Sequence, residues 1–250
     1  MDSAPNPTAL AVIPARYESS RFPGKALVDL AGKPMIVRVM ERVRAARWIA
    51  RVLVATDDER IAGAVRAAGG EAVLTRREHR SGTERLAEVA VQTGAPVYVN
   101  VQGDEPLIAP AAIDLAVEGL AADPAVSVAT LASPILEADV LMDPNVVKLV
   151  MDFDGNALYF SRAPIPWVRD PAPASPRHFR HIGLYVYRRE ALLEFPTLPP
   201  GELERTEQLE QLRWLENGLR IRVAVTQYDS PSVDVPADVP LVLARLASSG

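Results

Sequence analysis

Three cations lie within ten residues near the start of the chain. Arg16, Arg21 and Lys25 belong to a loop containing glycine and proline, which follows an apolar run from Ala9 to Ile13. Arginine offers phosphate oxygens a planar fork of donors and lysine a compact charge, so this spacing favours a polyanion such as a nucleotide triphosphate. The alternative is a solvated basic surface loop, because the segment matches neither the usual P-loop nor the dinucleotide fingerprint.

Carboxylates follow a later predicted strand and recur near the end of the chain. Residues 100–106 read Asn-Val-Gln-Gly-Asp-Glu-Pro and place Gln102, Asp104 and Glu105 at the carboxyl end of a strand expected over Val97–Val101. Mg²⁺ prefers oxygen ligands and is usually held by one or two carboxylates together with substrate phosphates, so Asp104 is a candidate ligand and Asp234 offers a second carboxylate. The alternatives are that Asp104 only forms a turn and Asp234 only caps the last helix.

A glycine and small hydroxyls open another expected helix, over Thr83–Thr93. The sequence Ser81-Gly-Thr-Glu-Arg85 precedes and enters this helix. Backbone N–H groups at such a helix start can bind a base, a ribose or a phosphate. The alternative is that Ser81 or Thr83 serves only as the helix cap.

The second half of the chain carries a different set of polar residues. Arg162 lies in a proline-rich, aromatic-flanked segment, while His181 and Tyr185 are four residues apart on an expected strand and hence on one face. Together they suit an acidic polyhydroxylated ligand, which needs one cation and several neutral hydrogen-bonding groups. Glu210 and Gln211 add polar groups. His181 could instead be structural, and Glu210 and Gln211 could be exposed helix residues.

β-rich and amphipathic runs alternate along the chain, a pattern typical of a parallel sheet covered by helices on both faces. We expect one α/β domain over residues 1–250, with approximately 132–187 forming an inserted substrate or dimerisation module. Within it, two antiparallel strands flank the turn at Asp154-Gly155, and Pro164–Pro176 is irregular. The main strands are expected at 9–13, 51–55, 71–74, 97–101, 126–131, 182–187 and 221–225, and the helices at 34–43, 58–68, 83–93, 109–122, 207–217 and 236–247.

Composition narrows the classes of protein. The chain has 250 residues, of which 48% are hydrophobic, enough for a substantial core. No apolar run could span a bilayer and no secretory signal is recognisable, so we expect a cytoplasmic protein without membrane insertion. The absence of cysteine fits a reducing compartment. A formal net charge of −5 argues against a nucleic-acid binder, so the local cations must serve a small site.

In their order and spacing, these motifs resemble the 3-deoxy-manno-octulosonate cytidylyltransferase (CMP-Kdo synthetase) family over nearly the whole chain. One departure lies near the end, where residues 230–236, Ser-Pro-Ser-Val-Asp-Val-Pro, replace the more usual Gly-Val-Asp-Thr-Pro pattern but retain Asp234. The resemblance rests on Phe22–Lys25, Ala55–Asp57, Ser81–Glu88, Val99–Pro106, Tyr159–Arg162, Pro164–Trp167, His181–Tyr185 and Leu209–Arg213.

The resemblance implies a Rossmann-like nucleotidyltransferase fold, Mg²⁺ dependence, CTP and Kdo as substrates, and a homodimer. The implied reaction forms CMP-Kdo for lipopolysaccharide biosynthesis and releases pyrophosphate. The alternatives are transfer of CMP to 8-amino-Kdo or a sialic acid, or a nucleotide-binding regulator without turnover. The resemblance implies nucleotide contacts by Arg16, Lys25, Ser81, Arg85 and Gln102, metal binding by Asp104 and Asp234, catalysis by Arg16, Lys25, Asp104 and Asp234, and sugar contacts by Arg162, His181, Tyr185, Glu210 and Gln211.

Overall fold

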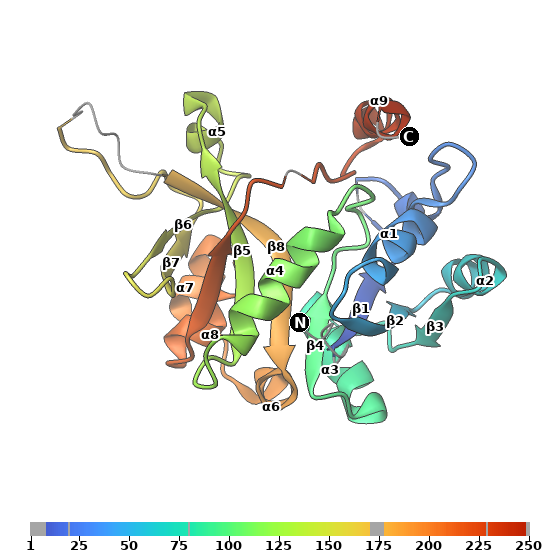
Figure 1. Cartoon of the computed structure of the whole chain (residues 1–250), viewed down its shortest axis with the longest axis horizontal. Helices are drawn as coiled ribbons and strands as arrows, with labels where there is room; N and C mark the ends of the chain where they lie inside the picture. Colours follow the sequence, from blue (N-terminus) through green and yellow to red (C-terminus); the bar gives the residue numbers. More distant parts are fainter. Residues whose placement is uncertain (1–8, 20, 80, 171–177, 229, 249–250) are drawn as a thin grey trace, which may run out of the picture.

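A central sheet of nine strands with helices on both faces organises the chain (Figure 1). The computed structural model describes residues 9–19, 21–79, 81–170, 178–228 and 230–248. The strands are β1 (Ala9–Ala15), β2 (Ile49–Thr56), β3 (Glu71–Leu74), β4 (Val97–Asn100), β5 (Val128–Ile135), β6 (Lys148–Met151), β7 (Ala157–Ser161), β8 (His178–Arg188) and β9 (Ile221–Val225).

The helices alternate with these strands, as the sequence pattern predicts. The α-helices are α1 (Met35–Arg44), α2 (Glu59–Ala67), α3 (Gly82–Thr93), α4 (Pro110–Ala121), α5 (Ala138–Met142), α6 (Arg189–Glu194), α7 (Glu202–Glu207), α8 (Leu212–Glu216) and α9 (Val239–Ser248). Three short 3₁₀ helices complete the set: η1 (Lys25–Leu27), η2 (Phe195–Thr197) and η3 (Pro236–Asp238). None of the helices in the described ranges is both long and apolar enough to cross a membrane.

The sheet is mostly parallel, in the order β3-β2-β1-β4-β8-β5-β9. β8 is the exception, because it runs antiparallel to both β4 and β5 in the middle of the sheet. The β6–β7 hairpin pairs onto the outer end of β8. The α/β fold class is therefore confirmed. The sequence pattern places antiparallel strands only in the insertion, whereas the antiparallel strand β8 lies between β4 and β5 in the central sheet.

The inserted module expected over approximately 132–187 stays a prediction, and both of its expected limits fall inside strands of the central sheet. β5 continues to Ile135 and β8 already begins at His178. α5 and the β6–β7 hairpin are the parts between them that lie off the main strand order. The role of this segment in substrate binding or dimerisation stays a prediction.

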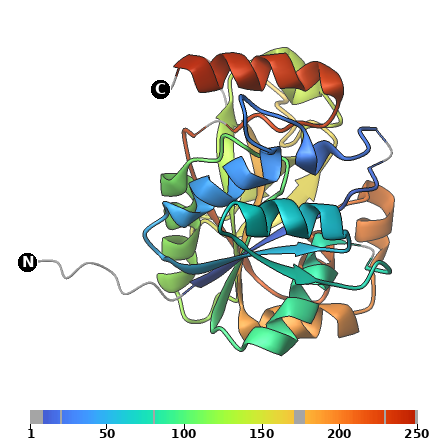
Figure 2. The same cartoon turned by 90° about the vertical axis from the view of Figure 1, so that its right-hand side faces the viewer.

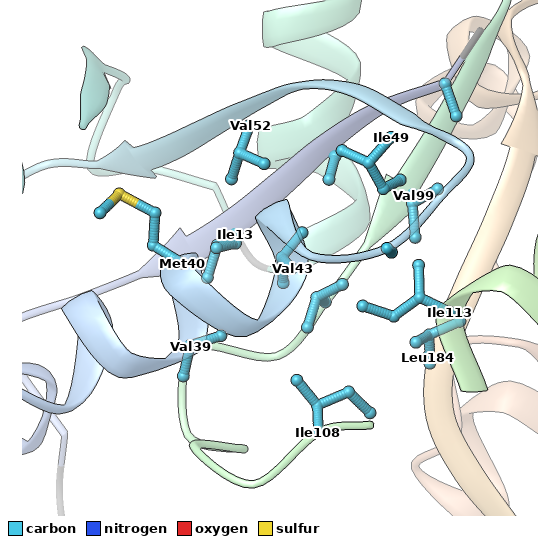
Figure 3. Close-up of a cluster of buried hydrophobic side chains, with 14 of the residues drawn as sticks. Ile13, Val39, Met40, Val43, Ile49, Val52, Val99, Ile108, Ile113 and Leu184 are labelled. Carbon is cyan, nitrogen blue, oxygen red and sulfur yellow. The ribbon is translucent and has the colours of Figure 1, made fainter. Parts of the chain in front are cut away.

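Two apolar layers hold the helices against the sheet. On one face α1, α2 and α4 pack on the strands; Figure 3 shows α1 residues Val39, Met40 and Val43 facing Ile13 and Val52. On the other face α3, α6 and α8 bury residues that include Leu86, Leu192 and Trp214. A smaller cluster of Leu30, Met35, Val233 and Val242 fixes α9, which crosses one end of the molecule in Figure 2.

Local signals explain several helix ends, and one failure. Asp58 caps α2 by accepting a hydrogen bond from the Arg60 N–H. The single helix expected over 207–217 is wrong, because Gln208 adopts a left-handed backbone (φ 54°) that ends α7, and α8 begins only at Leu212. Residues 164–170 contain no regular element, as expected, and the rest of that segment lies outside the described residues.

Candidate active site

Three charged side chains from distant parts of the chain meet at one edge of the sheet. Lys25 follows β1, Asp104 follows β4, and Asp234 precedes η3. The Lys25 Nζ lies 2.6 Å from Asp104 Oδ2 and 3.4 Å from Asp234 Oδ1. Arg21 adds a second cation, with Nη2 at 3.0 Å from the same Asp234 oxygen. We call Lys25, Asp104 and Asp234 the charged cluster.

Backbone contacts bring the two carboxylates together. The Val233 N–H donates to the Asp104 carbonyl at 2.9 Å, and Lys25 Nζ donates to the Val233 carbonyl at 3.2 Å. Gly103 allows the turn after β4 to approach β1, since a Cβ at this position would lie 2.8 Å from the Pro14 carbonyl oxygen. Asp104 can therefore belong to the turn after β4 and still contribute its carboxylate to the charged cluster.

The donor set of the charged cluster fits a hard divalent cation. Both carboxylates already converge on one cation, the Lys25 ammonium, and their side chains keep 24% and 39% of their surface exposed. Within the described ranges, no third acidic, histidine or cysteine side chain completes a protein-only metal cage. Mg²⁺ commonly takes one or two carboxylates and completes its shell with water and substrate phosphates, so such an open pair suits it.

The predicted nucleotide residues Arg16 and Gln102 border the same region. Arg16 Nη2 donates to the His79 carbonyl at 2.5 Å, and Gln102 Nε2 donates to the Gly183 carbonyl at 3.1 Å. Arg16 and Gln102 line a small recess of about 70 Å³ together with Lys25 and Asp104. Arg16 also lines a second recess, of about 170 Å³, beside the ends of β1 and β2.

Ser81 and Arg85 have clear structural partners. Ser81 Oγ accepts a hydrogen bond from the Glu84 N–H at 3.2 Å and caps α3, as its alternative interpretation predicts. Arg85 is fully buried, donating to Asp57 Oδ2 at 3.2 Å and to the Thr75 hydroxyl. Burial lowers the pKa of Arg85, although an arginine stays charged at any physiological pH. Direct nucleotide contact by either side chain stays a prediction.

His181 and Tyr185 are neighbours, as their spacing predicts. Their ring centroids lie 5.3 Å apart, within a row of rings that continues through Tyr187 to Trp214. His181 Nε2 is 2.9 Å from the Thr130 hydroxyl, and burial lowers the pKa of His181 to about 3. The imidazole is therefore neutral and a weak base. The Tyr185 hydroxyl is buried and has no hydrogen-bond partner among the described residues.

Glu210 and Gln211 are not the exposed helix residues of the alternative interpretation. Gln211 is buried, and Glu210 Oε2 accepts a hydrogen bond from the Thr83 hydroxyl at 2.7 Å. Burial raises the pKa of Glu210, whose Oε1 has no partner in the described part of the chain. Glu210 lines a cavity of about 420 Å³ that also borders Ser81 and Arg213.

Arg162 holds the turn that leads to these two residues. Its Nε donates to the Glu207 carbonyl at 2.8 Å, Nη1 to the Pro144 carbonyl at 3.0 Å and Nη2 to the Gln208 carbonyl at 3.4 Å. The Glu207 carboxylate in turn accepts from Ser161 Oγ at 2.6 Å and from the Arg162 N–H at 2.9 Å. Sequence reasoning missed Glu207, because nothing in its local pattern distinguishes it from a surface glutamate.

Glu105 is a second residue to which the sequence pattern assigns no role. It lies next to Asp104, yet only 8% of it is exposed. Burial, with a smaller repulsion from Asp104, raises the pKa of Glu105 to about 8. A glutamate between an aspartate and a proline is ordinary loop composition, so only the folded structure reveals this burial.

A family model, curated relatives and a solved structure that resemble this chain all carry the name of a cytidylyltransferase or of the corresponding synthetase. The cytidylyltransferase family model matches residues 10–221. The 3-deoxy-manno-octulosonate cytidylyltransferase of Geobacter sulfurreducens is 55% identical over 245 residues, covering 94% of this chain and 98% of that protein. The Syntrophotalea carbinolica protein of the same name is 56% identical over 243 residues, covering 94% and 97% respectively. The solved structure of a CMP:2-keto-3-deoxy-manno-octonic acid synthetase complexed with CTP superposes with a TM-score of 0.93 at 45% identity, covering 97% of this chain and 99% of the other.

Proposed function

The chain belongs to the cytidylyltransferase family, and on this basis we propose that it transfers CMP from CTP to 3-deoxy-manno-octulosonate (Kdo), releasing pyrophosphate and forming CMP-Kdo for lipopolysaccharide biosynthesis. The observation that carries the proposal is the charged cluster at the sheet edge. It offers two carboxylates and a lysine beside Arg16, in a fold shared with a CTP-complexed synthetase. Open α/β sheets bind ligands at this edge.

The reaction needs positioning and charge neutralisation more than a dedicated base. The anomeric hydroxyl of the sugar attacks the α-phosphorus of CTP in line, and pyrophosphate leaves. Arg16 and Lys25 would neutralise the phosphate charge as it moves onto the leaving group. Asp104 and Asp234 would hold Mg²⁺, which when bound supplies positive charge and lowers the pKa of a coordinated hydroxyl. The low pKa of His181 argues against that residue as the general base.

The remaining site residues extend the proposal. Ser81, Arg85 and Gln102 would shape the nucleotide site, directly or by holding its walls. For the acidic sugar we propose contacts by Glu210, which lines a cavity, and by Gln211, Tyr185, His181 and Arg162. The buried, unpartnered oxygens of Tyr185 and Glu210 support this assignment, since a hydroxylated ligand would supply the missing hydrogen bonds.

A homodimer in the cytoplasm completes the proposal. Of the large hydrophobic side chains that are exposed in the described residues, five lie between positions 136 and 167: Leu136, Met142, Phe153, Leu158 and Trp167. A second copy of the chain covering α5 and the β6–β7 hairpin would remove them from water. Light scattering of the purified chain, together with Phe153→Asp, measures whether a dimer forms there.

A pyrophosphate-release assay tests the reaction. The purified chain is given CTP, Mg²⁺ and, in separate reactions, Kdo, 8-amino-Kdo or a sialic acid. We expect the highest kcat/KM with Kdo. Faster turnover of another sugar would reassign the substrate, whereas CTP binding without turnover of any sugar would favour the non-catalytic regulator.

A further inference from the structure

The connection from β3 to α3 carries the carbonyl group that holds Arg16. Residues 75–79 form a loop, which we call the 75–79 loop, and Arg16 Nη2 donates to the His79 carbonyl at 2.5 Å. Arg16 is exposed, so its side chain would otherwise sample several rotamers in water. The remaining N–H groups of the guanidinium stay available to a phosphate. The position of the His79 carbonyl therefore determines where Arg16 can meet a ligand.

The ring of His79 is held by Glu88, which lies on α3. His79 Nε2 and Glu88 Oε2 form a hydrogen bond, and only 8% of the His79 side chain is exposed. Burial tends to raise the pKa of Glu88, but hydrogen bonds from His79 and from the Arg76 N–H outweigh burial and lower that pKa. Glu88 is therefore ionised at neutral pH. Because an ionised carboxylate can only accept, His79 Nε2 carries the proton of this hydrogen bond.

Further contacts fix the 75–79 loop between β2 and α3. The Arg76 N–H donates to Glu88 Oε2 at 3.2 Å, so the same carboxylate oxygen binds Arg76 and His79 and closes the turn between them. At the start of the loop, the Thr75 N–H donates to the last carbonyl of β2 at 2.9 Å, and the buried Arg85 of α3 donates to the Thr75 hydroxyl. α3 thus holds the loop in place before a ligand binds.

The side chains of His79 and Glu88 face a different recess from Arg16. They line a recess of about 270 Å³ between α3 and residues 193–196. Arg16 instead lines the small recess that contains Lys25 and Asp104. The two side chains can therefore act on a nucleotide at the charged cluster only through the backbone of the 75–79 loop.

We propose that His79 and Glu88 are positioning residues for Arg16: the Glu88 carboxylate holds the His79 ring, and the His79 carbonyl holds the Arg16 guanidinium ready for the phosphates of the nucleotide. The inference rests on the proposed function, in which Arg16 neutralises the charge that moves onto pyrophosphate. A guanidinium that is already in place loses less side-chain entropy when the nucleotide binds and reacts. Loss of either positioning residue should therefore weaken the effect of Arg16 without removing its charge.

A double-mutant cycle with Arg16 tests this inference. Glu88→Met and His79→Leu remove the hydrogen bond between the two side chains, whereas His79→Gln retains a side-chain N–H donor. Each substitution is made in the unsubstituted chain and in Arg16→Met. Glu78→Met, at an exposed glutamate of the same loop, is the matched control. We measure kcat/KM for CTP by pyrophosphate release at saturating Kdo, CTP affinity without sugar by calorimetry, and folding by urea unfolding.

In the chain that retains Arg16, Glu88→Met and His79→Leu should each lower kcat/KM for CTP roughly 10-fold, with a loss of less than about threefold in His79→Gln and less than about twofold in Glu78→Met. In Arg16→Met, the effects of Glu88→Met and His79→Leu should shrink to less than about twofold, because the group that they position is absent. CTP affinity should show the same dependence on Arg16.

A purely structural role for the two residues would give equal losses with and without Arg16, and that result would overturn the inference. It would also be overturned if Arg16→Met alone changed neither kcat/KM nor CTP affinity, or if His79→Gln lost as much as His79→Leu. No turnover of Kdo by the unsubstituted chain would instead overturn the proposed function. The dependence of CTP affinity on Arg16 would then still decide the inference.

Discussion

Lys25 Nζ and Asp104 Oδ2 are 2.6 Å apart, so the ammonium occupies the position toward which the two carboxylates of the charged cluster converge. This contact makes Lys25 a competitor of a divalent cation before nucleotide binds and a partner of phosphate afterwards. The positive charge of Lys25 should therefore weaken the binding of the metal ion and strengthen the binding of the nucleotide.

Lys25→Met should separate these two effects. We expect CTP affinity to fall at least about 10-fold, because a charge-assisted contact is lost. Affinity for Mn²⁺ without nucleotide should rise, because Asp104 is left without its cation and Asp234 retains only Arg21. Calorimetry with each ligand measures both, and Lys33→Met, which removes an exposed partner of Glu41, is the control. Weaker binding of both ligands would show that Lys25 does not compete with the metal.

Asp104→Asn and Asp234→Asn test the metal-binding proposal. Each substitution keeps the shape of the side chain but removes a negative charge, so we expect turnover to fall on the order of 10²-fold or more. Circular dichroism should show an intact fold. Asp170→Asn, at a highly exposed aspartate, should leave turnover unchanged. Near-normal turnover at saturating Mg²⁺ in either folded variant would remove that aspartate from the mechanism.

Arg85→Met tests whether the buried guanidinium stabilises the fold. Its loss leaves Asp57 without an ion-pair partner; because the Asp57 side chain is 15% exposed, we expect the free energy of unfolding to fall by about 2 to 4 kcal/mol. Arg66→Met breaks an exposed pair with Glu59 and should cost about 1 kcal/mol or less. Urea unfolding compares the two variants. Equal, small losses would contradict a structural role for Arg85.

His181 should make the fold less stable in mild acid. The pKa of His181 is about 3 in the folded chain against an ordinary value of 6.5, so between these values the unfolded chain binds a proton that the folded chain does not. Stability is therefore lost as the pH falls below 6.5. Between pH 7 and 5, the stability of the unsubstituted chain should fall by roughly 1 to 2 kcal/mol relative to His181→Gln. Urea unfolding at both pH values measures this difference. An equal change in stability between pH 7 and 5 for the unsubstituted chain and His181→Gln would contradict the prediction.

Local patterns predicted most of the elements in this chain. The spacing of Met35, Ile36, Val39, Met40 and Val43 corresponds to the buried face of α1, and Ser81 and Asp58 cap the helices that follow them. These features depend on residues within one or two turns, so they can be recognised without knowledge of the rest of the fold. The limits of α7 and α8 were missed because a left-handed residue at Gln208 carries no strong sequence signal.

By itself, the sequence determined the alternation of strands and helices, the family resemblance, and the residue types available for phosphate, metal and sugar binding. Only the tertiary structure decided which of them meet. Lys25 and Asp234 are 209 positions apart, and their contact depends on the parallel pairing of β1 with β4 and on the segment before η3. The burial of Glu105 and Arg85 was likewise decided by packing, because burial depends on every segment that covers a side chain and not on its neighbours in sequence.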